Sequence, residues 1–137
     1  MALAAVLAAV SGRLAAEWTR CPVRGPNAKS RNTPAADEPF VEVQYPVMTA
    51  SRISIGAPGA NRYRDEGAIR LVLNVVRGKG IDEAAAWIDE LRALFRGKSF
   101  DGVCTFAPSP PVIDDRNDDG RYYLLSFAVP FEHDYFG

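Results

Sequence analysis

The fold of this chain is decided by the stretch Arg121-Tyr122-Tyr123-Leu124-Leu125-Ser126-Phe127-Ala128-Val129-Pro130-Phe131. Its odd-numbered residues from Tyr123 onward are all apolar or aromatic. Because side chains two apart on a strand point to the same face, we predict a long strand whose odd face is buried in the core. That face carries no group that is charged or nucleophilic near neutral pH. The strand is therefore predicted to be part of the scaffold rather than of a reaction centre.

An acidic turn leads into this strand. Its residues Asp115-Arg116-Asn117-Asp118-Asp119-Gly120 match the first half of a calcium-binding loop, in which oxygen ligands alternate and a glycine allows the bend. The twelfth position of such a loop should be a glutamate but is Ser126 here, and the flanks are a proline-rich turn and a strand instead of two helices. Aspartate, asparagine and glycine are also common turn residues, so we interpret the segment as a turn and expect no metal site.

Composition limits the classes of protein to which this chain can belong. The 137 residues are 47% hydrophobic and 24% charged, which predicts one globular domain over residues 1–137. The net charge of −1 provides no overall field that would attract nucleic acid or an anionic membrane. Cys21 and Cys104 are far apart in the sequence, so we expect two reduced thiols rather than a disulfide framework or a zinc site.

Two amphipathic helices are predicted. The first covers about Ala2–Thr19 and is stopped by Pro22; its apolar stripe consists of Leu3, Val6, Leu7, Val10, Leu14 and Trp18. The second starts at Asp82, a good N-cap residue, and ends before Gly97 at the C′ position. Its buried stripe is predicted to contain Trp87, Ile88, Leu91, Leu94 and Phe95.

The remaining apolar runs predict short strands. Besides the final strand they are Phe40–Tyr45, which Pro46 either stops or places at an edge of the sheet, then Ser51–Ile55, Ala68–Val76 and Val103–Phe106. The order of elements is α-β-β-β-α-β-β. We predict an α+β fold, with an antiparallel-rich mixed sheet of about four to five strands and two helices packed on it.

No catalytic residue, cofactor site or metal site is expected. A catalytic histidine needs an orienting partner and a nucleophile, and the single histidine, His133, is expected to be exposed at the end of the last strand. A small α+β enzyme or ligand-binding domain is the alternative from another class. It would need a pocket lined by convergent polar groups, for which the sequence offers only His133 and scattered acids.

Charge is distributed unevenly over the loops. Solvated loops explain such clusters, but a second hypothesis is that a basic loop of one subunit meets an acidic turn of the next, a head-to-tail contact that can close into a ring. On that hypothesis the contact residues are Arg24, Lys29, Arg31, Arg52, Arg62, Arg64, Asp114, Asp115, Asp118 and Asp119.

The order, spacing and length of these segments together resemble the tail terminator, or tail completion, proteins of long-tailed bacteriophages. The segments that carry the resemblance are Arg13-Leu14-Ala15-Ala16, Pro39-Phe40-Val41-Glu42-Val43, Asn61-Arg62-Tyr63-Arg64-Asp65-Glu66-Gly67, Ile88-Asp89-Glu90-Leu91-Arg92-Ala93-Leu94-Phe95, and Tyr122-Tyr123 through Val129-Pro130-Phe131. The likeness covers nearly the whole chain.

The resemblance implies a structural, non-enzymatic role. Such proteins form a ring, commonly a homohexamer, on the head-proximal end of the tail tube, where they stop tube polymerisation and join the tail to the head connector. The implied partners are other copies of the chain, the tail tube protein and the connector or stopper protein. DNA would only pass through the lumen, and no membrane is involved. The implied location is the neck of the virion tail, after assembly in the host cytoplasm. A head-side stopper or another neck protein is the alternative within the same assembly.

Overall fold

A computed structural model of the protein describes residues 2–25, 39–76, 81–114 and 122–136. The described residues form two helices and seven strands, which confirms the α+β class. In chain order the elements are α1 (Ala2–Glu17), β1 (Val23–Arg24), β2 (Phe40–Arg52), β3 (Arg62–Val76), α2 (Asp82–Phe95), β4 (Ser99–Phe100), β5 (Val103–Thr105), β6 (Val112–Asp114) and β7 (Tyr122–Phe136).

The centre of the sheet is the antiparallel pair β3 and β7, which stay in register from Arg62 opposite Phe136 to Val76 opposite Tyr122. The strand order is β1-β2-β3-β7-β5-β4, and β6 also pairs with β7. Among the seven strands of the described residues, only β1 runs parallel to its neighbour, β2. The sheet is therefore mixed and mostly antiparallel, as predicted, while the number and order of its strands differ from the prediction.

Both helices pack on the same face of this sheet. In the core, the apolar stripes of α1 and α2 pack against odd-numbered residues of β3 and β7 and against two residues of β2. Its members include Val10, Leu14, Val41, Val43, Ile69, Leu71, Leu73, Ile88, Leu91, Phe95, Leu125, Phe127, Val129 and Phe131. The predicted buried face of the last strand is confirmed, with Tyr123 half-buried at its start.

Helix boundaries follow local sequence signals with small differences. Leu3 is 51% exposed, so the buried stripe of α1 begins at Val6 instead. Asp82 is not the N-cap: Ile81 holds that position without a side-chain cap, and Asp82 lies in the first turn, where its charge favours the helix dipole. Gly97 has a φ of 58°, as expected for a C′ glycine. Trp87 is half-buried and makes an edge-on contact with Trp18.

Three strands are longer than predicted. β2 continues through Pro46 because the register shifts between Gln44 and Val47, so the missing N–H of the proline falls in a bulge. Of the predicted strand Ser51–Ile55, only Ser51 and Arg52 lie in β2, and the other three residues follow it outside any strand. Likewise β3 begins at Arg62 instead of Ala68, and β7 continues past Phe131 to Phe136.

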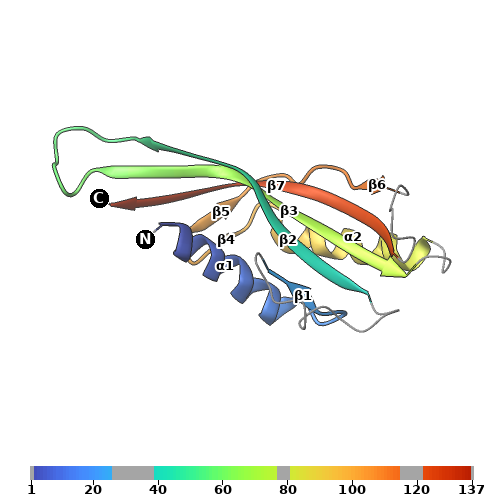
Figure 1. The fold of residues 1–137 in the computed structure, drawn as a ribbon. Helices are drawn as coiled ribbons and strands as arrows, with labels where there is room; N and C mark the ends of the chain where they lie inside the picture. The colour runs from blue at the N-terminus through green and yellow to red at the C-terminus, as the bar shows by residue number, and fades with distance from the viewer. Residues whose placement is uncertain (1, 26–38, 77–80, 115–121, 137) are drawn as a thin grey trace.

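These extensions build a three-stranded arm, which extends past the ends of both helices in Figure 1. We define the arm as residues 47–68 of β2, β3 and their connection together with residues 131–136 of β7. Its tip is the turn between β2 and β3. There the Arg62 backbone N–H donates to Ser54 Oγ at 2.6 Å, and the Ala57 N–H donates to Asn61 Oδ1 at 3.2 Å. The tip is therefore held by its own hydrogen bonds.

Candidate assembly surface on the arm

The arm has two different faces, because side chains alternate along its strands. Its inner face continues the core-facing side of the sheet and carries Tyr63 and Asp65 of β3. Its outer face, which neither of the two described helices covers, carries Arg62, Arg64 and Glu66 of β3 beside the even-numbered residues of β7. The outer face is therefore the candidate surface for contacts with other molecules.

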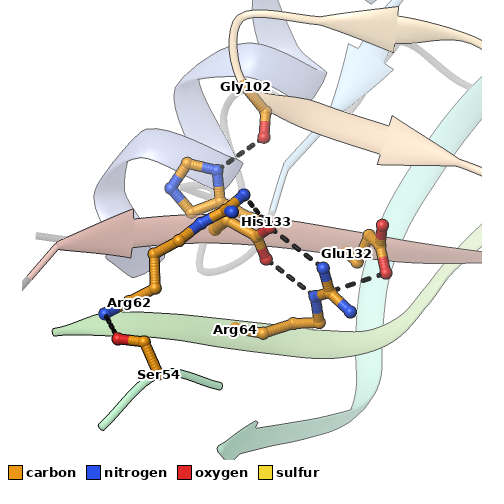
Figure 2. Close-up of polar contacts among 7 residues, drawn as sticks. Ser54, Arg62, Arg64, Gly102, Glu132 and His133 are labelled. Carbon is orange, nitrogen blue, oxygen red and sulfur yellow. Dashed lines mark hydrogen bonds and ion pairs between the residues drawn. The ribbon is translucent and has the colours of Figure 1, made fainter. Parts of the chain in front are cut away.

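A cluster of ion pairs occupies the outer face toward the tip. Arg64 donates from two nitrogens to the two carboxylate oxygens of Asp134, at 2.8 and 3.0 Å, and Arg62 donates to the same carboxylate at 2.9 Å. Arg64 Nε also lies 3.5 Å from Glu132, and Figure 2 shows both arginines and Glu132 meeting on this face. Hydrogen bonding from Arg64 holds the pKa of Asp134 below its ordinary value of 3.8, and Arg62 adds to this effect. The charges of both arginines are thus largely met within the subunit.

This cluster predicts a specific dependence of stability on pH. Folding lowers the pKa of Asp134. The stabilisation that the ionised carboxylate gives to the folded protein is therefore fully present above the unfolded pKa near 3.8, and it is lost as the pH falls through the lower folded pKa. Asp134→Asn should therefore lower the free energy of unfolding at pH 7 by about 1 kcal/mol or less, as for partly exposed ion pairs. Urea unfolding should show this deficit shrinking below pH 4. A deficit that stays constant down to pH 2 would contradict the assignment.

On the inner face, His133 is buried at 8% exposure, so the expectation of an exposed histidine is wrong. Its Nδ1 lies 2.8 Å from the carbonyl oxygen of Gly102, and because a carbonyl can only accept, Nδ1 carries the proton in this contact. The His133 ring also stacks on Tyr135, which in turn stacks on Tyr63. Burial and the nearby Asp65 raise the pKa of Tyr135. His133 therefore fixes the β4–β5 turn to β7 (Figure 2).

The other predicted contact residues are scattered or lie outside the described residues. Arg24 lies in β1 opposite Glu42, and Asp114 ends β6 opposite Leu124. Arg52 ends β2 near the arm tip and is exposed, with no ion pair among the described residues. The structure brings only Arg52, Arg62 and Arg64 into one region, the distal arm. The predicted contacts outside the described ranges are Lys29, Arg31, Asp115, Asp118 and Asp119.

A shallow groove crosses the outer face at the base of the arm and was not predicted from the sequence. It measures about 550 Å³ and is lined by Val47, Thr49, Glu66, Gly67, Ala68, Phe106, Pro130, Phe131 and Glu132. The hollow exists because small residues, Gly67 and Ala68, lie between larger ones on neighbouring strands. Only the pairing register shows this, since Ala68 and Pro130, which lie opposite each other, are distant in the sequence.

Neither a metal centre nor a membrane span is apparent in the described part of the chain. Within those ranges no three residues among His, Cys, Asp and Glu are grouped so that they could hold a metal ion. The calcium-like segment Asp115–Gly120 lies outside the described residues. No described helix is long and apolar enough to cross a membrane. Cys21 and Cys104 are both free and half-buried, and burial raises the pKa of the Cys21 thiol.

Comparison with known proteins identifies the family. A family model described as phage tail terminator protein matches residues 5–131, from the first turn of α1 to the base of the arm in β7. A solved structure aligns with 100% of this chain and 99% of its own, at 21% identity and a TM-score of 0.61, and this likeness supports the fold alone. A search of curated proteins found no match. The chain belongs to the phage tail terminator protein family, and its role is that of a structural protein of the phage tail.

Proposed function

We propose that the protein forms a ring on the head-proximal end of the tail tube, where it ends tube polymerisation and joins the tail to the head connector. The observation that carries this proposal is the family match over residues 5–131. Its partners would be other copies of itself, the tail tube protein and the connector or stopper protein, in the neck of the virion. Assembly would take place in the host cytoplasm, and the protein would act by binding rather than by catalysis.

The shape of the subunit supports an assembly role. A ring needs a head-to-tail contact in which one surface of each subunit meets a different surface of the next, with a rotation that closes. The arm extends beyond the helix-covered core, and neither described helix covers its outer face, so it offers surface that a compact monomer would not need. Exposed apolar side chains lie on this arm and near it, including Val47, Ile53, Ile55, Phe106 and Phe136.

The charged loop residues predicted from the sequence remain proposed contacts. Arg62 and Arg64 are already paired with Asp134, so they would contribute less to a partner contact than an unpaired cation. Arg52 has no such internal partner among the described residues and is the stronger candidate. The remaining proposed contacts are Arg24, Lys29, Arg31, Asp114, Asp115, Asp118 and Asp119.

A phage that lacks the gene for this protein tests the role directly. We expect electron microscopy to show tails of uncontrolled length that are not joined to heads, and supply of the protein in trans should restore normal tails. Purified protein added to growing tubes should form rings and cap one tube end. Normal, joined tails in the absence of the protein would refute the proposal. Density located on the head side of the neck would instead support a stopper.

A further inference from the structure

We infer that neighbouring copies are joined by the tip of one arm, Arg52–Ile55, seated in the outer-face groove of the next copy. This inference rests on the proposed ring and identifies the two surfaces that would close it. Three features carry it: the exposure of the tip, the shape and lining of the groove, and the charge that each surface leaves unpaired.

The tip presents apolar side chains in a fixed conformation. Ile55 is 87% exposed, the highest value among the exposed large hydrophobic residues, and Ile53 is 40% exposed. The Ile53 N–H donates to the Arg62 carbonyl at 2.8 Å, and Ser54 Oγ accepts from the Arg62 N–H, so the backbone that carries both isoleucines is held in place. A surface fixed before binding loses less conformational entropy when it docks.

The groove presents the complementary shape. Its walls include Val47 at 57% exposure and Phe106 at 44% exposure, together with the exposed Pro130, and its hollow lies over Gly67 and Ala68. Within the isolated subunit these apolar walls face solvent. An inserted isoleucine would remove apolar surface from water on both partners, which favours association.

Charge supports the same pairing. The Arg52 guanidinium beside the tip and the Glu66 carboxylate at the edge of the groove are both exposed, and neither has an ion pair among the described residues. By contrast, Arg62 and Arg64 are matched with Asp134 inside the subunit. Glu66 interacts with the charge of Arg64 but makes no ion pair with it. Docking the tip would therefore bring Arg52 toward a carboxylate that can still form an ion pair, and this attraction would also orient the tip in the groove.

A subunit cannot fill its own groove. Arg62, which is hydrogen-bonded to the tip, and Ala68 at the groove lie on one continuous strand, six residues or about 20 Å apart. The paired strands on either side prevent the arm from folding back. The contact must therefore be made between copies, and its two surfaces are different. Such a contact repeats from subunit to subunit, as a ring requires.

Two single variants and their mixture test the contact. Ile55→Asp replaces the apolar side chain of the tip with a charged one, and Val47→Asp places a charge in the wall of the groove. Both positions are exposed, so neither change should alter the circular dichroism spectrum. Each variant alone should sediment as a monomer, with each contact weakened roughly tenfold or more, as expected from loss of a buried isoleucine. Mixed together they should give dimers, because one intact tip and one intact groove remain. Val112→Asp, at a 60% exposed position on β6, is the control and should assemble like the wild type.

A charge exchange tests the polar part independently. Arg52→Glu and Glu66→Arg should each weaken assembly, and the double variant should recover it because every subunit then carries both reversed partners. Recovery limited to the double variant would identify the pair, and equal weakening in all three would refute it.

The outcomes separate this inference from the proposed function. If the wild type forms rings and Ile55→Asp forms them equally well, the tip-to-groove contact is overturned but the proposed ring is not. The same conclusion holds if Val112→Asp disrupts the rings as strongly as Ile55→Asp does. If Ile55→Asp still forms rings but no longer binds tubes, the tip docks on another tail component and the contact is also overturned. If the wild type never assembles and never caps tubes, the proposed function itself fails.

Discussion

Replacing Phe95 with alanine is expected to lower the free energy of unfolding by about 3–5 kcal/mol, the usual cost of removing a fully buried phenylalanine ring. Phe95 is the last residue of α2 and is 0% exposed. Its ring packs edge-on against the ring of Phe100, with the two ring centroids 6.0 Å apart. Its carbonyl oxygen also accepts a hydrogen bond from Thr105 Oγ1, so the ring and backbone both tie α2 to the sheet. The loss would be a large fraction of the total stability of a typical small domain.

Urea unfolding followed by circular dichroism measures this effect. Phe136→Ala provides the matched control, because it removes the same ring from a position that is 73% exposed on β7. We expect that change to alter the unfolding free energy by about 0.5 kcal/mol or less. Equal losses for the two variants would show that α2 does not pack on the sheet as described.

Gly67→Ala is the second variant with a large expected effect. A Cβ added at Gly67 would lie 2.1 Å from the Val47 carbonyl oxygen, and that oxygen is backbone, so it cannot move without shifting β2. The clash falls beside the bulge at Gln44/Val47, where β2 changes register. We expect the unfolding free energy to fall by about 1–3 kcal/mol or more, as is usual for overpacking. The shift should also deform the groove, which Val47 and Gly67 both line.

Gly12→Ala is the control for this prediction because it adds the same methyl group in open space. Gly12 lies within α1, is exposed, and has no atom within 4 Å of an added Cβ. Alanine is the better helix former, so this variant should gain roughly 0.5–1 kcal/mol. The two glycine replacements should therefore change the thermal midpoint in opposite directions. A shift of the same sign for both would contradict the close approach at Gly67.

The parts of the fold that the sequence predicted depend on local pattern. The buried face of β7 follows from alternation along one strand, and the end of α2 follows from Gly97. By contrast, β1 and β6 have only two and three residues, too few for any period to appear. They are strands because β2 and β7 lie beside them. The bulge that carries β2 past Pro46 was also not predicted, since a bulge depends on the partner strand.

The candidate surface was less predictable for the same reason. Arg62 and Arg64 were singled out as charged loop residues, but their pairing with Asp134 depends on the β3–β7 register, which joins segments distant in the sequence. His133 was misplaced because a residue at the end of the last strand was expected to be exposed. Once β7 is known to continue to Phe136, alternation alone puts His133 on the buried side.

The long pairing of β3 with β7 has a consequence for how the protein is made. β3 emerges from the ribosome soon after β2 and can form a hairpin with it, but residues 122–136 must be synthesised before β3 gains its second neighbour. Until then, Ile69, Leu71 and Leu73 lack the β7 residues that help to bury them. Such distant contacts slow folding and lengthen the exposure of apolar surface to aggregation. Completion of the sheet must therefore wait until β7 has been synthesised.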